Sequence, residues 1–153
     1  MSGPVMDFAE VEAALANANG QSAWAATLGV GSFLTVEFGA EVPSRRASGR
    51  RHGEFHLWLY CSAWRIERPG EVIASSEDPR EELTKRVQIL DGQVLSAIRI
   101  ERPSLSCTVS FADGTQLRTF SIFTTGYEHW MFYLPDSRVF TARPGMDWSL
   151  GLD

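Results

Sequence analysis

The chain has 153 residues, 44% of them hydrophobic and 22% charged, which suits one globular domain of ordinary size. A net charge of −5 argues against a nucleic-acid partner, because such a partner is usually met by a basic surface. No apolar run approaches the roughly 20 residues needed to cross a bilayer, and residues 1–7 do not resemble a secretion signal. The abundance of arginine, with Lys85 the one lysine, is typical of a GC-rich genome. We therefore expect a bacterial, cytoplasmic protein with no membrane partner.

Two helices are predicted from capping signals and apolar spacing. The first begins at Asp7, where Glu10 completes a capping box, and it ends at Gly20. The second begins at Asp78, with Pro79 in its first turn and Glu81 completing the box, and it ends at Gly92.

Most of the remaining chain is predicted to form strands. Residues 54–61 alternate with period two, and both faces are apolar, which indicates a central strand covered on both sides. Asp113-Gly114 is the clearest hairpin signal. Short breaks between the later strands predict an antiparallel meander. The predicted strands are 33–38, 54–61, 64–67, 72–74, 93–101, 105–112, 116–124, 128–134 and 139–142.

The two halves of the chain resemble each other with a period of about 72 residues. Gly20-Gln21 matches Gly92-Gln93, and the motif Thr-Val-x-Phe occurs at 35–38 and again at 108–111. Glu54 and Glu128 match at a slightly larger shift, so the strand at 116–124 stands where the first copy has a loop. These matches predict an α+β fold of two similar α-β-β-β-type halves, 6–76 and 77–150, within a single domain over 1–153. The mostly antiparallel sheet would carry both helices on one face.

A ligand pocket is predicted where the halves meet. Two of the three histidines occupy near-equivalent places in the copies, each close to a glutamate and followed by aromatic residues. The pocket residues are His56, Trp58, Tyr60, Glu128, His129 and Trp130. The alternative is that these aromatic residues belong to the core or to a surface that contacts another subunit.

The segment 40–52 is predicted to be a mobile loop. It carries four of the 14 basic residues within seven positions: Arg45, Arg46, Arg50 and Arg51. Guanidinium groups suit oxyanions, so this loop is a candidate site for an anion or an acidic partner surface, and a plain solvated loop is the alternative.

No catalytic motif is present. The chain contains no nucleophile elbow, phosphate loop, dinucleotide fingerprint or His-Glu-x-x-His sequence. The histidine spacing matches no metal-ligand motif, and Cys61 and Cys107 read as reduced thiols in strands. We therefore assign no catalytic residue, no metal and no cofactor, and we leave enzymatic activity open while favouring a non-enzyme.

Two segments carry a family resemblance, LSCTVSFADGTQL at 105–117 and EHWMFYLPD at 128–136. They resemble small bacterial proteins of unknown function that share a strand, Phe-x-Asp-Gly, a second strand and Glu-x-Trp-x-x-x-x-Pro-Asp. Some of these are grouped with immunity proteins of polymorphic toxin systems. Glu128 and Trp130 match the pattern, which carries no known catalytic residue.

The leading functional hypothesis is a non-catalytic binding protein with an immunity-like or inhibitory role toward a protein partner. A small-ligand-binding protein or enzyme, with its pocket at the junction of the halves, is the first alternative. A homodimer that uses the aromatic face of the sheet is the second.

Overall fold

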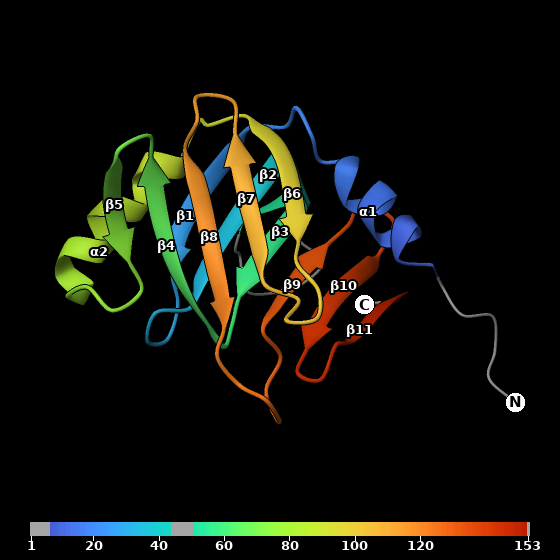
Figure 1. Cartoon of the computed structure of the whole chain (residues 1–153). Coiled ribbons are helices and arrows are strands. Elements are labelled where there is room, and N and C mark those ends of the chain that lie inside the picture. Colours follow the sequence, from blue (N-terminus) through green and yellow to red (C-terminus); the bar gives the residue numbers. More distant parts are fainter. Residues whose placement is uncertain (1–6, 44–50, 153) are drawn as a thin grey trace, which may run out of the picture.

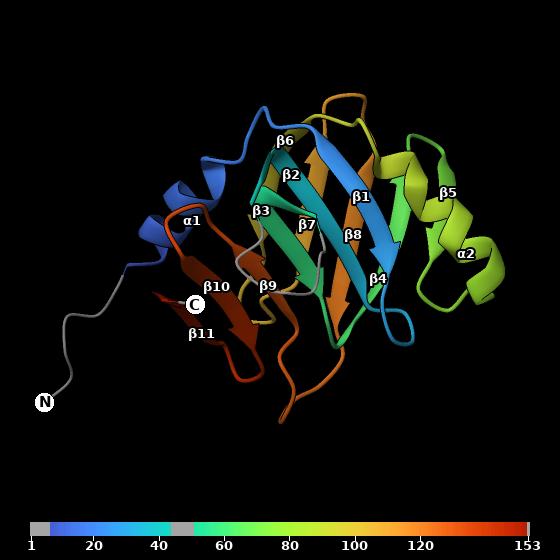
Figure 2. The ribbon, with the colours of Figure 1, turned by 180° about the vertical axis from the view of Figure 1, so that it is seen from behind.

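Two antiparallel sheets lie face to face in the computed structural model, which describes residues 7–43 and 51–152 (Figures 1 and 2). The six-stranded sheet has the order β1-β2-β3-β9-β10-β11, and the five-stranded sheet has the order β5-β4-β8-β7-β6. The expected α+β class and antiparallel pairing are confirmed. The strands are β1 (Ala23–Leu28), β2 (Leu34–Val42), β3 (His52–Leu59), β4 (Ser62–Arg68), β5 (Glu71–Ser75), β6 (Leu95–Ile100), β7 (Cys107–Phe111), β8 (Gln116–Ser121), β9 (Trp130–Tyr133), β10 (Arg138–Arg143) and β11 (Asp147–Leu152).

The first helix, α1 (Phe8–Ala16), begins as its sequence predicts. The Asp7 carboxylate accepts the amide of Ala9, and the apolar stripe from Phe8 to Leu15 is buried. The second helix is shorter than expected, because α2 (Arg80–Arg86) gives way to a 3-10 turn, η1 (Val87–Leu90). The capping box predicted at Asp78 is wrong: this carboxylate accepts the amide of Ser75 at the end of β5, and no side chain caps α2.

The helices lie at opposite ends of the molecule, and not together on one face as expected (Figure 1). Helix α1 contacts β6, and α2 contacts β5, which are the two edge strands of the five-stranded sheet. The reason is that each sheet already covers the inner face of the other. The helices are left to cover the edges.

The segments that follow the two helices pair with each other in a reciprocal way. Gly20 donates its amide to the carbonyl of Leu95, and Gly92 donates to that of Ala23. The amide of Ala23 donates to Gln93, and that of Leu95 donates to Gln21. In each pair of bonds, adding 72 to the donor of one bond and subtracting 72 from its acceptor gives the other bond. The repeat noticed in the sequence therefore corresponds to a local pseudo-two-fold arrangement, whereas its origin by duplication stays a prediction.

The two halves exchange strands. The strands β1, β2 and β3 pair in sequence order in one sheet, and β6, β7 and β8 do the same in the other. The chain then crosses between the sheets: β4 pairs with β8, and β9 pairs with β3. The meander expected for the later strands is therefore interrupted after β8, because β9 joins the other sheet. Each sheet is completed by strands from the other half.

This topology corrects the alignment of the two copies. In β2 and β3, Val36 lies opposite Leu57, and in β7 and β8, Val109 lies opposite Leu117. The strand at 116–121 is therefore the counterpart of β3, and the glutamate match at 54 and 128 does not join equivalent strands. The loop before β3 is simply longer than the Asp113-Gly114 hairpin before β8.

Two strands lie outside the sequence prediction. Strand β1 has no clean alternation because Ala25 adopts a positive φ of 50° and the register shifts between Trp24 and Thr27. Strand β11 follows the turn at Gly145 and pairs along β10. In addition, β2 extends to Val42 and β3 begins at His52, so both ends of the segment predicted as a loop are strand.

Candidate functional site

The predicted pocket residues lie on two sides of the six-stranded sheet. Alternation along β3 buries Phe55, Leu57 and Leu59 in the core, and so directs His56 and Trp58 to the outer face. Trp130 points into the core, where it is fully buried and donates its indole N–H to the carbonyl of Leu105. The structure therefore does not gather the six residues into one pocket.

The remaining pocket residues lie near the end of β3. The amide of Tyr60 donates to the carbonyl of His129, and that of Cys61 donates to Glu128. The His129 side chain is buried, and its Nδ1 has no hydrogen-bond partner among the described residues. Burial lowers the pKa of His129, because the charged imidazolium loses its hydration there. His129 is thus a neutral, buried ring.

Rings on the outer face at the junction of β3 and β9 form two contacting groups. Trp58 lies edge-on to Tyr60 with centroids 5.3 Å apart, and His56 lies edge-on to Tyr133 at 5.4 Å. Tyr60 also contacts Phe33 at 4.6 Å. These side chains are half-buried, so the set is ordered yet accessible. We call this surface the aromatic seam: His56, Trp58, Tyr60 and Tyr133.

The equivalent junction in the other sheet, between β8 and β4, carries different chemistry. Arg118 lies opposite Arg65, and Gln116 lies opposite Glu67. Glu67 contacts both arginines, with a 2.6 Å hydrogen bond from Arg65. By the strand correspondence above, Arg118 stands where the aromatic seam has Trp58. We call this surface the arginine seam: Arg65, Glu67, Gln116 and Arg118.

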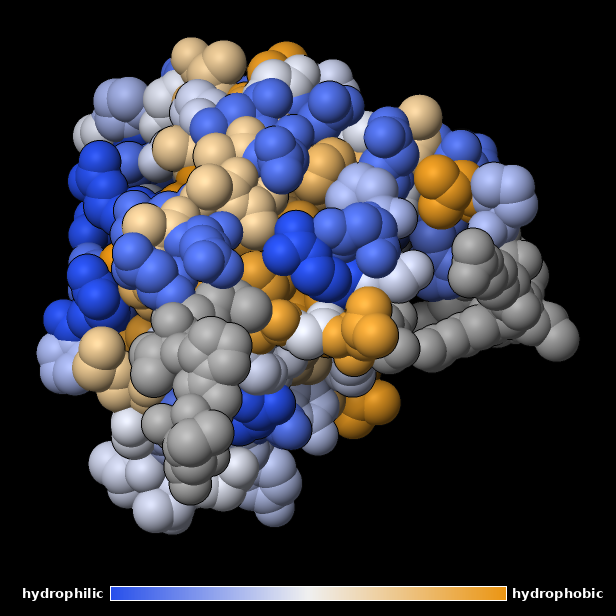
Figure 3. Space-filling model, turned by 90° about the vertical axis from the view of Figure 1, so that its right-hand side faces the viewer, coloured by the Kyte–Doolittle hydropathy of each residue, from blue (hydrophilic) through white to orange (hydrophobic). Residues whose placement is uncertain are grey.

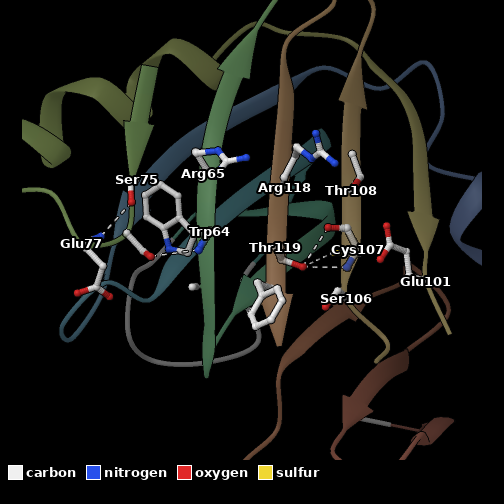
Figure 4. Close-up of a pocket in the computed structure, with 13 residues that line it drawn as sticks. Trp64, Arg65, Ser75, Glu77, Glu101, Ser106, Cys107, Thr108, Arg118 and Thr119 are labelled. Carbon is white, nitrogen blue, oxygen red and sulfur yellow. Dashed lines mark hydrogen bonds between the residues drawn. The ribbon is translucent and has the colours of Figure 1, made fainter. Parts of the chain in front are cut away.

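A cavity of about 320 Å³ adjoins the arginine seam. Figure 4 shows Arg65 and Arg118 at one level of neighbouring strands, with the hydroxyl of Thr119 bonded to Cys107 below them. Burial raises the pKa of the Cys107 thiol to about 12, so it stays protonated and is no nucleophile. Polar and charged side chains dominate the lining, whereas ligand pockets are usually lined by apolar ones.

The arginine-rich segment 40–52, predicted as a loop, lies mostly outside the described residues, which exclude Arg45, Arg46 and Arg50. Arg51 is described. Its guanidinium pairs with the Glu41 carboxylate at 2.9 Å and lies over the Trp24 ring, 4.9 Å from the centroid. This pairing lowers the pKa of Glu41. Arg51 therefore has partners within the sheet.

One cluster on the outer face has no counterpart in the sequence prediction. Glu37 on β2 is 4% exposed, although it belongs to the outer face of the sheet. Its carboxylate accepts a short hydrogen bond from His56 Nδ1, lies 3.9 Å from His52 Nδ1 and accepts the amide of Gly53 at 3.0 Å. A glutamate within the apolar run at 34–38 is the signal that a sequence search could have used.

Backbone irregularity builds this cluster. Gly39 has a φ of 82°, and the register between β2 and β3 shifts after Phe38, which is a bulge. Gly53 passes so close to Phe38 that a Cβ there would lie 2.6 Å from its carbonyl oxygen. The bend brings the start of β3 back over Glu37, so that the rings of His52 and His56 lie 6.0 Å apart.

Apolar residues also occur on other parts of the surface. Seen from the side on which α1 lies, hydrophilic residues surround smaller hydrophobic areas in the part not drawn in grey (Figure 3). Four exposed apolar side chains lie at the end of β8 and in the segment that leads to β9: Phe120, Ile122, Phe123 and Tyr127.

Comparison with protein-family models, with curated proteins and with solved structures gives no match. Among the described residues, no helix has the length and apolar character needed to span a bilayer.

Proposed function

We propose that the protein is a non-catalytic binding protein whose partner is another protein, and that the aromatic seam is its interface. An immunity-like or inhibitory role toward that partner is the concrete form of the proposal. The observation that carries it is the set of half-buried rings on the outer face of the six-stranded sheet.

The seam has the chemistry of an interface centre. Tryptophan and tyrosine are enriched among the residues that dominate binding energies, because they offer large contact areas with few rotatable bonds. Trp58 and Tyr133 are each held by a neighbouring ring. Side chains already fixed before binding lose less entropy when the partner arrives.

The contrast between the seams supports the same assignment. Both seams lie at equivalent strand junctions, so the fold alone accounts for neither set of outward side chains. Rings occupy one junction, and two arginines bridged by Glu67 occupy the other. The aromatic character is thus a property of one surface and not a requirement of the architecture.

Charge favours a basic partner. The chain carries a net charge of −5 at neutral pH. Opposite net charges accelerate association, which matters for an inhibitor that must act quickly.

The ligand-pocket alternative has weaker support. The residues proposed for it are divided between the core and the outer face, and the cavity beside the arginine seam is mostly polar. A homodimer through the aromatic seam remains the second alternative, and it is an outcome of the same experiment.

The test compares equivalent positions in the two seams. The purified chain is used to capture proteins from its native host, and each captured protein is then purified and titrated against wild type, Trp58→Ala and Arg118→Ala. We expect Trp58→Ala to weaken binding by about 2 kcal/mol or more, roughly 30-fold. Arg118→Ala should leave the affinity nearly unchanged. Circular dichroism confirms that both variants are folded.

Two results would contradict the proposal. Equal affinities of wild type and Trp58→Ala for every captured protein would remove the aromatic seam as the interface. A wild-type dimer in light scattering that Trp58→Ala converts to a monomer would assign the seam to self-association.

A further inference from the structure

The cluster of Glu37, His52 and His56 is more than one hydrogen-bonded pair. Its donor atoms, one from each residue, all lie within 4.8 Å of one another. Glu37 and His56 already form a hydrogen bond. His52 Nδ1 lies 3.9 Å from the same carboxylate, which is beyond hydrogen-bond distance.

The carboxylate is held in place by the backbone. The amide of Gly53 donates to Glu37 Oε1 at 3.0 Å, within the bulge that Gly39 and Gly53 allow. Such a hydrogen bond orients a ligating carboxylate and fixes its position before an ion binds.

We propose that Glu37, His52 and His56 form a binding site for a divalent transition metal ion, with Zn²⁺ the best fit. Two imidazole nitrogens and one carboxylate are an established ligand set for zinc. Neutral imidazole also suits other late first-row ions, whereas calcium and magnesium prefer sites made of oxygen.

The distances suit an ion of this size. Zinc binds nitrogen at 2.0–2.1 Å, so a tetrahedral ion keeps its ligand atoms about 3.3 Å apart. Donors within 4.8 Å reach that spacing by ring rotation of His52 and by release of the hydrogen bond between His56 and Glu37. The ion then replaces that bond with two of its own.

Three protein ligands leave a tetrahedral ion one open position. The His52 and His56 side chains are 35% and 21% exposed, so solvent reaches the cluster. Water or a partner side chain can occupy the fourth position. The site shares His56 with the aromatic seam, but it rests on its own geometry and does not require a protein partner.

The test uses the full chain without a purification tag, after treatment with chelator. Zinc chloride is titrated by calorimetry into wild type, His52→Ala and Glu37→Gln, with Glu41→Gln as the matched control on the same strand. We expect one equivalent of Zn²⁺ for wild type and for Glu41→Gln. Losing a direct ligand should weaken binding by more than about 10-fold, because losing an outer hydrogen-bond partner alone costs that much.

A second measurement identifies the ligands. The visible spectrum of the Co²⁺-loaded chain should show a low-coordinate ion without a thiolate charge-transfer band. A thiolate band would place the ion at Cys61 or Cys107 and overturn the proposal. Equal heats of binding for wild type and His52→Ala would also overturn it. His52 is partly exposed, so this variant is decisive even if Glu37→Gln does not fold.

A further variant separates the two proposals. Trp58→Ala should bind Zn²⁺ as wild type does, because Trp58 supplies no ligand. Failure of protein binding through the seam therefore leaves the metal site standing, and the reverse also holds.

Discussion

Trp64 and Trp130 occupy equivalent places in the two sheets. Each side chain points into the core and is almost fully buried. Each also donates its indole N–H to a backbone carbonyl just before a strand of the opposite sheet. The acceptors are Ser32 before β2 and Leu105 before β7. Each bond thus joins the two sheets within one half of the chain: a tryptophan on an exchanged strand reaches back to the sheet that holds the other strands of its own half.

Replacing these tryptophans tests the equivalence. We expect Trp64→Phe and Trp130→Phe each to lower the free energy of unfolding by about 1–3 kcal/mol, since each leaves a carbonyl without its partner. Trp130→Phe should cost more, because Leu105 is fully buried whereas Ser32 is partly open to water. Urea denaturation gives both values. A tryptophan whose replacement costs nothing would show that the two contacts are not equivalent.

Gly53 has a steric role that can be tested separately. A Cβ at this position would lie 2.6 Å from the carbonyl oxygen of Phe38, within the bulge. We expect Gly53→Ala to destabilise the fold by about 1–3 kcal/mol, as other overpacking changes do. Gly151→Ala is the matched control, since a Cβ there meets nothing within 4 Å. Similar midpoints of urea denaturation for the two variants would contradict the close approach of Gly53 to Phe38.

His129 makes stability depend on pH. Its folded-state pKa is lowered by burial, so in mildly acidic solution the unfolded chain takes up a proton that the folded chain resists. The stability contribution is therefore present above the unfolded pKa of 6.5 and is lost as the pH falls below it.

We expect the free energy of unfolding to be smaller at about pH 5.5 than at about pH 7.5. His129→Gln removes this contribution, so the difference between the two pH values should shrink. The variant keeps every other residue of the chain, so the comparison isolates the contribution of His129. An unchanged pH dependence in the variant would show that His129 is not responsible.

Local signals predicted the local structure well. The capping aspartate Asp7 and the Asp113-Gly114 turn stand where the sequence places them, because each depends on contacts between near neighbours. Strand β1 escaped prediction because the positive φ of Ala25 breaks its alternation. The repeat was visible in Gly20 and Gly92, whose amides bond across the two halves.

The path between the sheets could not be predicted in the same way. Nothing in residues 60–62 distinguishes a tight hairpin from a crossing, since the partner of β4 lies far along the chain in β8. The site residues were misplaced for a related reason. The outward position of His56 and the inward position of Trp130 depend on which strands pair, and Glu37 joins His52 only through a bulge.

The exchange of strands has a consequence for how the chain folds during synthesis. Strand β3 pairs with β9, and β4 pairs with β8. Neither sheet can therefore be completed while only the first half of the chain has left the ribosome. Such distant pairings slow folding, because the entropy of closing a long loop is lost before the stabilising contacts form. A nascent first half would expose the apolar faces of both its strand groups, and would be a natural client for a chaperone until the second half emerges.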